Sequence, residues 1–230
     1  MSDAAVRAQA LERLHESLRQ CTRCDLCEGR TTVVVGAGDP DADLMFVGEA
    51  PGANEDRTGV PFVGAAGKLL DQLLGEIGLD RDRVFIANVL KCRPPGNRDP
   101  QASEIEACQG FLAEQVSLIR PRLVCTLGNF ATKLISGSPD GISTVHGKVQ
   151  HVQFAGVPFT LYPVYHPAAA LYTRSMLSVL QEDFARIPGL IAGGDAPEPL
   201  TPASSSVSTP AVAATPASAS DGATQLDLFS

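Results

Sequence analysis

Three carboxylates and five glycines share one segment that follows an apolar, strand-like run. This segment, residues 48–70, reads GEAPGANEDRTGVPFVGAAGKLL. A glycine-rich turn after a strand commonly binds phosphate through its backbone N–H groups. Here Glu49, Glu55 and Asp56 would repel a phosphate, and the Lys-Ser/Thr pair of a phosphate-binding loop is missing. The residue types instead favour a flat, neutral ligand beside carboxylates that stabilise developing positive charge; the alternative is a solvated surface loop.

Six cysteines offer a second kind of chemistry, metal binding. Four candidate ligands lie in a CxxC pair after the first expected helix, in a basic loop and on a later expected helix: Cys21, Cys24, Cys92 and Cys108. In a cytosolic chain we do not expect a disulfide framework. The spacing leaves a zinc site, an iron–sulfur site and simple burial open, with Cys27 as a competing ligand. Cys125 lies in the apolar run RLVCTLG and is expected in the core.

Strands that alternate with helices are expected to position these residues. Apolar runs predict strands at residues 43–48, 83–90, 122–128, 149–154 and 159–164, and helical spacing predicts helices at residues 1–20, 65–77, 101–120, 128–135 and 174–187. Asp99 is expected to cap the third of these helices, with Pro100 in its first turn. The alternation predicts a three-layer α/β/α fold around a central, mainly parallel four-stranded sheet, with ligands at the carboxyl ends of its strands. Asn88 near the end of the second strand and His166 after the last both fall at that edge.

The composition predicts one folded, soluble domain. The chain has 230 residues, of which 44% are hydrophobic, enough for a core. It has no run of about 18 apolar residues, and its charged N-terminal helix pattern is not a secretory signal, so we expect a cytoplasmic protein that does not bind membranes. The net charge of −8 is unusual for a nucleic-acid binder, but all 18 Lys and Arg residues precede residue 190. The Lys91–Arg98 segment and Arg174 are therefore candidates for a local basic face.

Five short motifs together resemble the family 4 uracil-DNA glycosylases, the iron–sulfur branch of the uracil-DNA glycosylase superfamily. They are GEAPG and PFVG in the glycine-rich segment, AN and KCRPP after the second strand, and HPAA after the last, within residues 11–187. The resemblance implies a monofunctional DNA repair glycosylase that flips uracil out of single- or double-stranded DNA and hydrolyses its N-glycosidic bond, without a divalent metal. It also implies a 4Fe–4S cluster held by Cys21, Cys24, Cys92 and Cys108.

The resemblance further implies how uracil is read. A base inside a duplex cannot be reached, so such an enzyme extrudes it and contacts its edge and its face. Phe62 would stack on the base, and Asn88 would accept from uracil N3–H and donate to O4. Cytosine presents the opposite polarity at both positions. Ala50 and Gly52 would form the pocket wall, while Glu55 matches the position that blocks a thymine methyl or a ribose.

Catalysis in such a site is expected to be electrostatic. Breaking the glycosidic bond leaves negative charge on uracil near O2 and positive charge on the sugar. By resemblance His166 contacts uracil and donates to O2, and Glu49 orients the attacking water or offsets the charge on the sugar. Other branches of the superfamily have an aspartate where this chain has Ala50, so the water lacks an obvious strong base here.

The same residues allow two other readings. A branch of the superfamily traps uracil-DNA covalently without turnover, using a long basic loop with a nucleophilic histidine. The corresponding segment, KCRPPGNRDP at residues 91–100, is compact and contains no histidine, which favours turnover. An iron–sulfur electron carrier would not explain Phe62, Asn88 and His166 as a set.

The C-terminal region differs in composition from the rest. We expect a glycosylase domain with its iron–sulfur cluster at residues 1–190, a disordered Pro/Ala/Ser/Thr-rich linker at 191–224 and a short binding peptide at 225–230. The peptide resembles the QLxLF-type motif with which bacterial repair proteins dock on the replication sliding clamp, through Gln225, Leu226, Leu228 and Phe229. The alternative is a remnant that packs on the domain.

We expect a monomer associated with the nucleoid.

Overall fold

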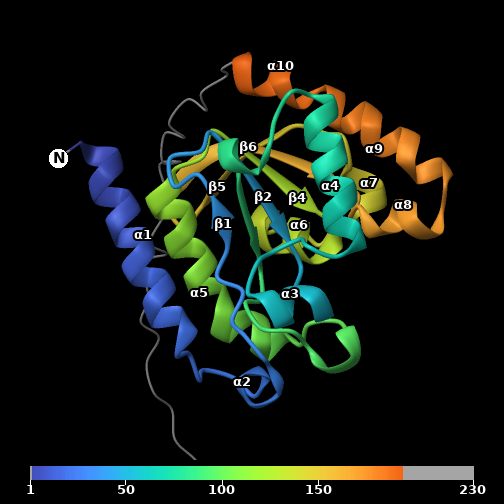
Figure 1. Ribbon diagram of the computed structural model, residues 1–230. Helices are drawn as coiled ribbons and strands as arrows, with labels where there is room; N and C mark the ends of the chain where they lie inside the picture. The colour runs from blue at the N-terminus through green and yellow to red at the C-terminus, as the bar shows by residue number, and fades with distance from the viewer. Residues whose placement is uncertain (1, 194–230) are drawn as a thin grey trace, which may run out of the picture. The chain divides into compact units, whose positions relative to one another are not determined.

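The computed structural model describes residues 2–193, which form a three-layer α/β/α arrangement around one sheet (Figure 1). The predicted binding peptide and nearly all of the predicted linker lie outside these residues. The strands are β1 (Ala37–Gly38), β2 (Leu44–Gly48), β3 (Phe85–Asn88), β4 (Leu123–Leu127), β5 (Gln150–Phe154) and β6 (Val157–Val164). The helices are α1 (Asp3–Arg19), α2 (Leu26–Gly29), α3 (Ala53–Thr58), α4 (Ala65–Glu76), α5 (Ala102–Ile119), α6 (Asn129–Ser136), α7 (Ile142–Val145), α8 (Ala168–Tyr172), α9 (Ser175–Ala185) and α10 (Ile187–Ala192), with 3-10 turns η1 (Arg81–Arg83) and η2 (Pro95–Asn97).

The sheet has the strand order β1-β3-β2-β4-β6-β5. Its four central strands are parallel, which confirms the predicted parallel centre, and β1 and β5 add an antiparallel strand at each edge. The strand β5 must run antiparallel to β6 because only Ala155 and Gly156 connect them, both with positive φ, as in a tight hairpin turn. The two-residue strand β1 was not predicted, since it is too short to show an alternating pattern.

Both faces of the sheet are covered, which explains why β2, β3 and β4 are apolar and buried along almost their whole length. Helices α1, α5 and α6 contribute to the core on one face, and α4, α9 and α10 to the core on the other (Figure 1). On the second face, Phe46 of β2 stacks on Phe184 of α9 with ring centroids 5.7 Å apart. Within residues 2–193, no helix is long and apolar enough to cross a membrane.

Three local predictions were wrong. Gln101, not Asp99, caps α5, because the Glu104 carboxylate accepts from the Gln101 backbone N–H at 2.8 Å and completes a capping box. The segment after His166, expected as a loop, contains the short helix α8. The last predicted helix, at residues 174–187, ends earlier, at Ala185 in α9, and a separate short helix that was not predicted, α10 (Ile187–Ala192), follows it.

Candidate active site

A small pocket lies at the carboxyl edge of the parallel strands, where the ends of β2 and β3 pair in register. Its lining consists of Ala50, Glu55, Phe62, Ala66, Asn88 and His166. The cavity volume is about 70 Å³. Small-molecule pockets usually measure about 300–1,000 Å³. The site therefore suits a single flat ring better than an extended ligand.

Asn88 presents an unused hydrogen-bond acceptor to this pocket. The side chain is 2% exposed, and its Oδ1 atom is buried without a hydrogen-bond partner among the described residues. Buried polar atoms in proteins are nearly always paired, so an isolated acceptor in a pocket indicates a ligand that carries a donor. The Asn88 backbone carbonyl is held separately, by the Lys91 ammonium group at 2.8 Å.

Phe62 and His166 form the aromatic part of the pocket. Their rings stack, with centroids 5.5 Å apart and an interplanar angle of 30°. The His166 Nδ1 atom accepts a hydrogen bond from the Ala168 backbone N–H at 3.1 Å. Burial lowers the His166 pKa to about 4, so the ring is neutral near pH 7. Its single proton must then sit on Nε2, which makes His166 a neutral hydrogen-bond donor.

Glu55 closes the loop that carries Phe62. Its Oε1 atom accepts hydrogen bonds from the backbone N–H groups of Val63 at 2.8 Å and Gly64 at 2.7 Å, at the start of α4. The next carboxylate, Asp56, is also structural, because it accepts from the Thr31 backbone N–H at 2.9 Å. Two of the three carboxylates noted in the sequence therefore bind the chain's own backbone.

Two predicted site residues, one expected in the pocket wall and one expected to be catalytic, lie outside the lining. Gly52 is beside the Glu55 carboxylate, where an added Cβ would come within 2.7 Å of Oε2. Glu49 is half-buried, and burial together with the nearby Asp99 carboxylate raises its pKa. Conversely, Ala66 lines the pocket but was missed, because an alanine in a helix shows no sequence signal of a site.

Gly48 leaves room for the side chains of Phe62 and Asn88. A Cβ atom here would lie 2.6 Å from Phe62 Cζ and would also collide with Asn88 Oδ1. Gly48→Ala should therefore displace both side chains and lower the turnover rate at this site by about 100-fold, the scale of a misplacement near 1 Å. The control is Gly75→Ala in α4, where an added Cβ meets nothing within 4 Å. Single-turnover assays on folded proteins measure the effect, and equal rates for both variants would contradict it.

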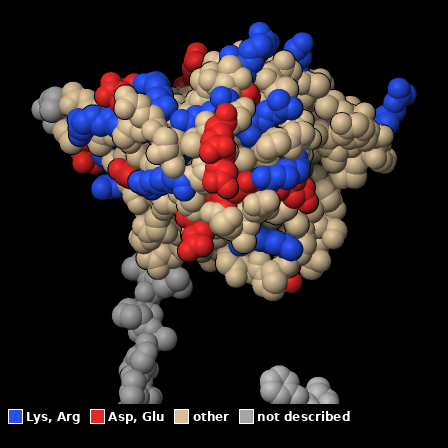
Figure 2. Space-filling model, turned by 90° about the horizontal axis from the view of Figure 1, so that it is seen from below, with Lys and Arg blue, Asp and Glu red and all other residues tan. Residues whose placement is uncertain are grey.

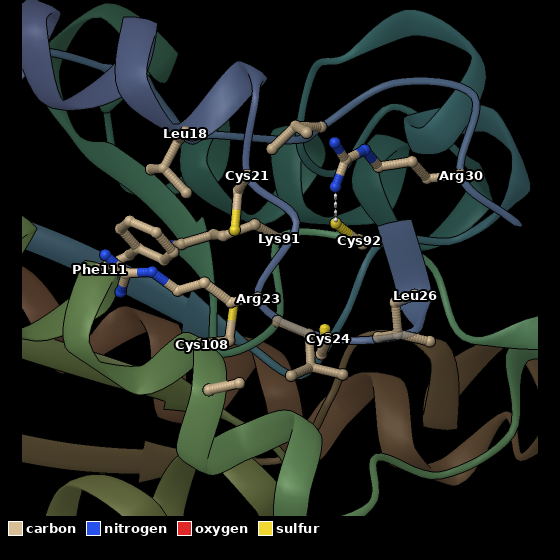
Figure 3. A pocket seen from close by; sticks show the side chains of 13 residues that line it. Leu18, Cys21, Arg23, Cys24, Leu26, Arg30, Lys91, Cys92, Cys108 and Phe111 are labelled. Atoms are coloured by element: carbon tan, nitrogen blue, oxygen red, sulfur yellow. Dashed lines mark hydrogen bonds between the residues drawn. The ribbon is translucent and has the colours of Figure 1, made fainter. Parts of the chain in front are cut away.

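The four candidate ligand cysteines line a second pocket, shown in Figure 3. They come from the end of α1, the segment before α2, the loop after β3, and α5: Cys21, Cys24, Cys92 and Cys108. Cys27 is not part of this lining, and Cys125 is fully buried in β4, as predicted. Burial raises the pKa of the Cys92 thiol to about 11, although Arg30 Nη1 lies 3.4 Å from its Sγ. Among residues 2–193, no group of three or more His, Cys, Asp or Glu side chains is arranged so that it could hold a single metal ion.

Lys91 belongs to this second pocket and is 1% exposed, so the prediction that it contributes to a basic face was wrong. Its ammonium group donates to the Asn88 carbonyl at 2.8 Å and to Gln115 Oε1 at 2.6 Å. Burial lowers its pKa to about 8. In the part of the chain that the structure describes, no carboxylate forms an ion pair with Lys91.

The surface near the loop after β3 carries both signs of charge. Figure 2 views the molecule from below relative to Figure 1 and shows Lys and Arg interspersed with Asp and Glu. Arg98 forms a 2.5 Å ion pair with Glu104, and Arg93 donates to Asn97 at 2.7 Å. Arg174 is exposed. The predicted basic face is thus reduced to a few arginines on a mixed surface.

Comparison with known proteins gives a family for this arrangement. The model of the uracil DNA glycosylase superfamily matches residues 35–186, a range that includes every residue of the first pocket. The chain belongs to the uracil-DNA glycosylase superfamily. A type-4 uracil-DNA glycosylase of Sulfurisphaera tokodaii is 48% identical over 183 residues, covering 77% of this chain and 83% of that protein.

Two further relatives show how the similarity differs between the type-4 and type-5 branches of the superfamily. A type-4 uracil-DNA glycosylase of Thermotoga maritima is 40% identical over 188 residues, covering 80% of this chain and 96% of that protein. A type-5 uracil-DNA glycosylase of Pyrobaculum aerophilum is 35% identical over 159 residues, covering 62% and 68%. These type-4 proteins match with higher identity and over more of the chain than the type-5 protein does. The chain is therefore more similar to them than to the type-5 protein.

Proposed function

We propose that this chain excises uracil from DNA by hydrolysing the N-glycosidic bond and leaves an abasic site. The observation that carries the proposal is the buried Asn88 Oδ1 atom, which lacks a partner among residues 2–193 and lies in a pocket with Phe62 and His166. Uracil N3–H would donate to this atom, and the Asn88 amide would donate to uracil O4. Cytosine would oppose both hydrogen bonds. The names of the type-4 relatives support the same reaction.

The bound base would be a uracil extruded from the DNA helix, since its glycosidic bond cannot be reached in the stack. The Phe62 ring would cover one face of the base. As the bond breaks, negative charge would develop on uracil O2, and the neutral His166 Nε2–H would donate to that atom. Because the ring holds no positive charge at neutral pH, its contribution is a preorganised hydrogen bond.

The other side of the reaction involves the carboxylates. We assign Glu49 to orienting the attacking water or offsetting positive charge on the sugar, from its half-buried position beside the pocket. Ala50 would form the wall without supplying a base, and Gly52 would keep the adjoining turn small. Glu55 would exclude a thymine methyl or a ribose while its carboxylate binds the loop backbone.

The test is incubation of the purified protein with single-stranded, U·G and U·A oligonucleotides in the presence of EDTA, followed by alkaline cleavage. Strand breaks only at uracil and only after alkali would support monofunctional excision. A protein–DNA adduct that survives denaturation would instead indicate covalent trapping. An adduct formed only with borohydride would indicate lyase chemistry and contradict the monofunctional assignment. Thymine and cytosine oligonucleotides are the specificity controls.

We also propose that the cysteine pocket holds a 4Fe–4S cluster. The donor set fits, because four thiols from separated segments line one pocket. The buried Lys91 cation in the same lining supports an anionic occupant, since a cluster with four thiolate ligands carries net negative charge. The cluster would link the end of α1 to the loop after β3 and to α5, and would stabilise the segment that leads back to Asn88.

Changing Cys92 to serine should remove the cluster and lower the free energy of unfolding by about 2 kcal/mol or more, because metal binding contributes directly to folding. Cys27→Ser is the matched control and should keep the cluster, since Cys27 does not line the pocket. The measurements are iron and sulfide content, visible absorbance and denaturant unfolding after anaerobic purification. One equivalent of zinc without iron or sulfide would overturn the assignment, as would cluster loss in Cys27→Ser but not in Cys21→Ser.

A further proposal concerns the residues beyond the described part of the chain. We propose that residues 225–230 dock on the replication sliding clamp, with Gln225 as the polar anchor and Leu228 and Phe229 as apolar plugs. The composition of residues 194–224 predicts a linker, and a flexible chain of about 30 residues spans about 30 Å. Such a tether would raise the local concentration of a monomeric enzyme on nucleoid DNA in the cytoplasm. It would also compensate for the net charge of −8, which weakens phosphate attraction.

Replacing Leu228 and Phe229 together with alanine should abolish clamp binding and leave excision on short oligonucleotides unchanged. The reason is that the two apolar side chains would supply most of the buried contact area of so short a peptide. Titration of labelled clamp with the full-length protein and with the double variant measures the effect. Equal binding by both proteins, or binding by neither, would reject the docking role.

A further inference from the structure

Phe62 adopts an unusual backbone conformation. Its φ is +54°, in the left-handed region that bulky residues rarely enter. The side chain is 6% exposed and stacks on His166. A non-glycine residue keeps such a conformation only where its surroundings impose it. Contacts that hold the Phe62 backbone therefore determine where its ring lies.

Arg81 of η1 supplies those contacts from outside all five sequence motifs. Its guanidinium donates to the Pro61 carbonyl at 2.8 Å through Nη1 and to the Phe62 carbonyl through Nη2. Its Nε atom donates to Asp71 Oδ1 of α4 at 2.5 Å. One planar group thus joins two consecutive carbonyls of the loop to the helix that follows it.

The same backbone is constrained from two other directions. Glu55 accepts from the next two backbone N–H groups, those of Val63 and Gly64. Gly67 lets α4 approach the Phe62 carbonyl, because an added Cβ at Gly67 would collide with that oxygen. The Arg81 cation therefore holds the carbonyls before the helix, and the Glu55 carboxylate holds the N–H groups that follow them. Together these contacts fix the backbone that directs the Phe62 ring into the pocket.

We propose that Arg81 is a positioning residue for uracil binding, which acts by holding the carbonyls of Pro61 and Phe62 so that the Phe62 ring stays against His166 and the base. The inference rests on the proposed stacking role of Phe62. Arginine suits the task because its rigid fork serves three acceptors at once, whereas the single ammonium of a lysine does not match that geometry. The Arg81 and Asp71 side chains are 28% and 48% exposed, so their ion pair contributes little to the stability of the fold.

The test compares Arg81→Ala and Arg81→Lys with a matched control, Arg83→Ala. Arg83 lies in the same 3-10 turn and also donates to a backbone carbonyl, that of Gly78 at 3.3 Å. Arg81→Ala should lower single-turnover excision and weaken inhibition by free uracil by about 10- to 100-fold, with a smaller loss in Arg81→Lys. Arg83→Ala should stay within about twofold of wild type on both measures, and all three variants should melt near the wild-type temperature.

A double-mutant cycle with Phe62→Ala separates positioning from a general structural effect. If Arg81 acts through Phe62, Arg81→Ala should cause no further loss in the Phe62→Ala background. An equal loss in both backgrounds, or a loss in Arg81→Ala no greater than in Arg83→Ala, would overturn the proposal.

A second readout does not depend on excision. The His166 ring proton resonances report the stacked Phe62 ring by NMR, and the chain has only four histidines to assign. These resonances should shift in Arg81→Ala but not in Arg83→Ala. An unshifted His166 would contradict positioning by Arg81 even in an active enzyme. Failure of wild-type excision with the expected shift would count against the proposed function and not against Arg81.

Discussion

Replacing His166 with alanine should lower the single-turnover rate of uracil excision by about 100-fold or more, the scale of losing one donor to a developing oxyanion. The expectation follows from the neutral ring, whose Nδ1 is occupied by the Ala168 N–H and whose Nε2 proton is therefore available to the base. The control is His151→Ala, an exposed residue of β5 that should keep the wild-type rate. A His166→Ala rate within a few-fold of wild type would remove His166 from the mechanism.

The pH dependence of excision distinguishes a neutral from a charged His166. Burial lowers the His166 pKa to about 4, below its ordinary value of 6.5. The neutral donor is then fully present from pH 8 down to about pH 5, and the rate should not fall over this range through His166. If the charged ring were the active form, the rate would instead rise steeply as the pH falls towards 4. Single-turnover rates of wild type and His166→Ala, measured side by side, isolate this contribution.

Replacing Asn88 with alanine should lower uracil excision by about 1,000-fold, because two hydrogen bonds to the base are lost in a buried site where each unpaired group costs about 1–3 kcal/mol. The Asn88 Oδ1 atom has no other partner among the described residues, so its removal leaves no protein group unsatisfied and the fold should persist. The loss should appear in the apparent binding of uracil as well as in the chemical step.

The matched control for Asn88 is Asn97→Ala, since Asn97 is an exposed asparagine at the end of η2. Asn97→Ala should excise uracil at nearly the wild-type rate. Assays with uracil and cytosine oligonucleotides measure discrimination between the bases directly. An Asn88→Ala variant that still excises uracil within about tenfold of wild type would show that other groups read the base.

Much of the architecture could be predicted because its signals are local. Continuous apolar runs separated by amphipathic helices encode a parallel sheet covered on both faces, and the sheet centre follows from that alternation. The edges could not be predicted in the same way. The strand β1 has two residues, and the direction of β5 depends on the hairpin turn at Ala155 and Gly156. The residue that caps α5 is Gln101 and not the predicted Asp99, because the Glu104 side chain completes a capping box with Gln101.

The residues of the candidate site could also be predicted only in part from the sequence. The resemblance of five short motifs to a known family pointed to Asn88, Phe62, His166 and the four cysteines. Residue type and spacing alone left zinc binding, an iron–sulfur site and simple burial open for the cysteines. The assembly of the site residues depended on strand register, which sets Gly48 beside Asn88, and on long-range packing. Three features show no local pattern in the sequence. They are the burial of Lys91, the position of Glu49 outside the pocket lining, and the hydrogen bonds from Arg81 to the backbone at Phe62. Each depends on neighbours distant in the chain, such as Gln115 for Lys91, so only the tertiary structure decides them.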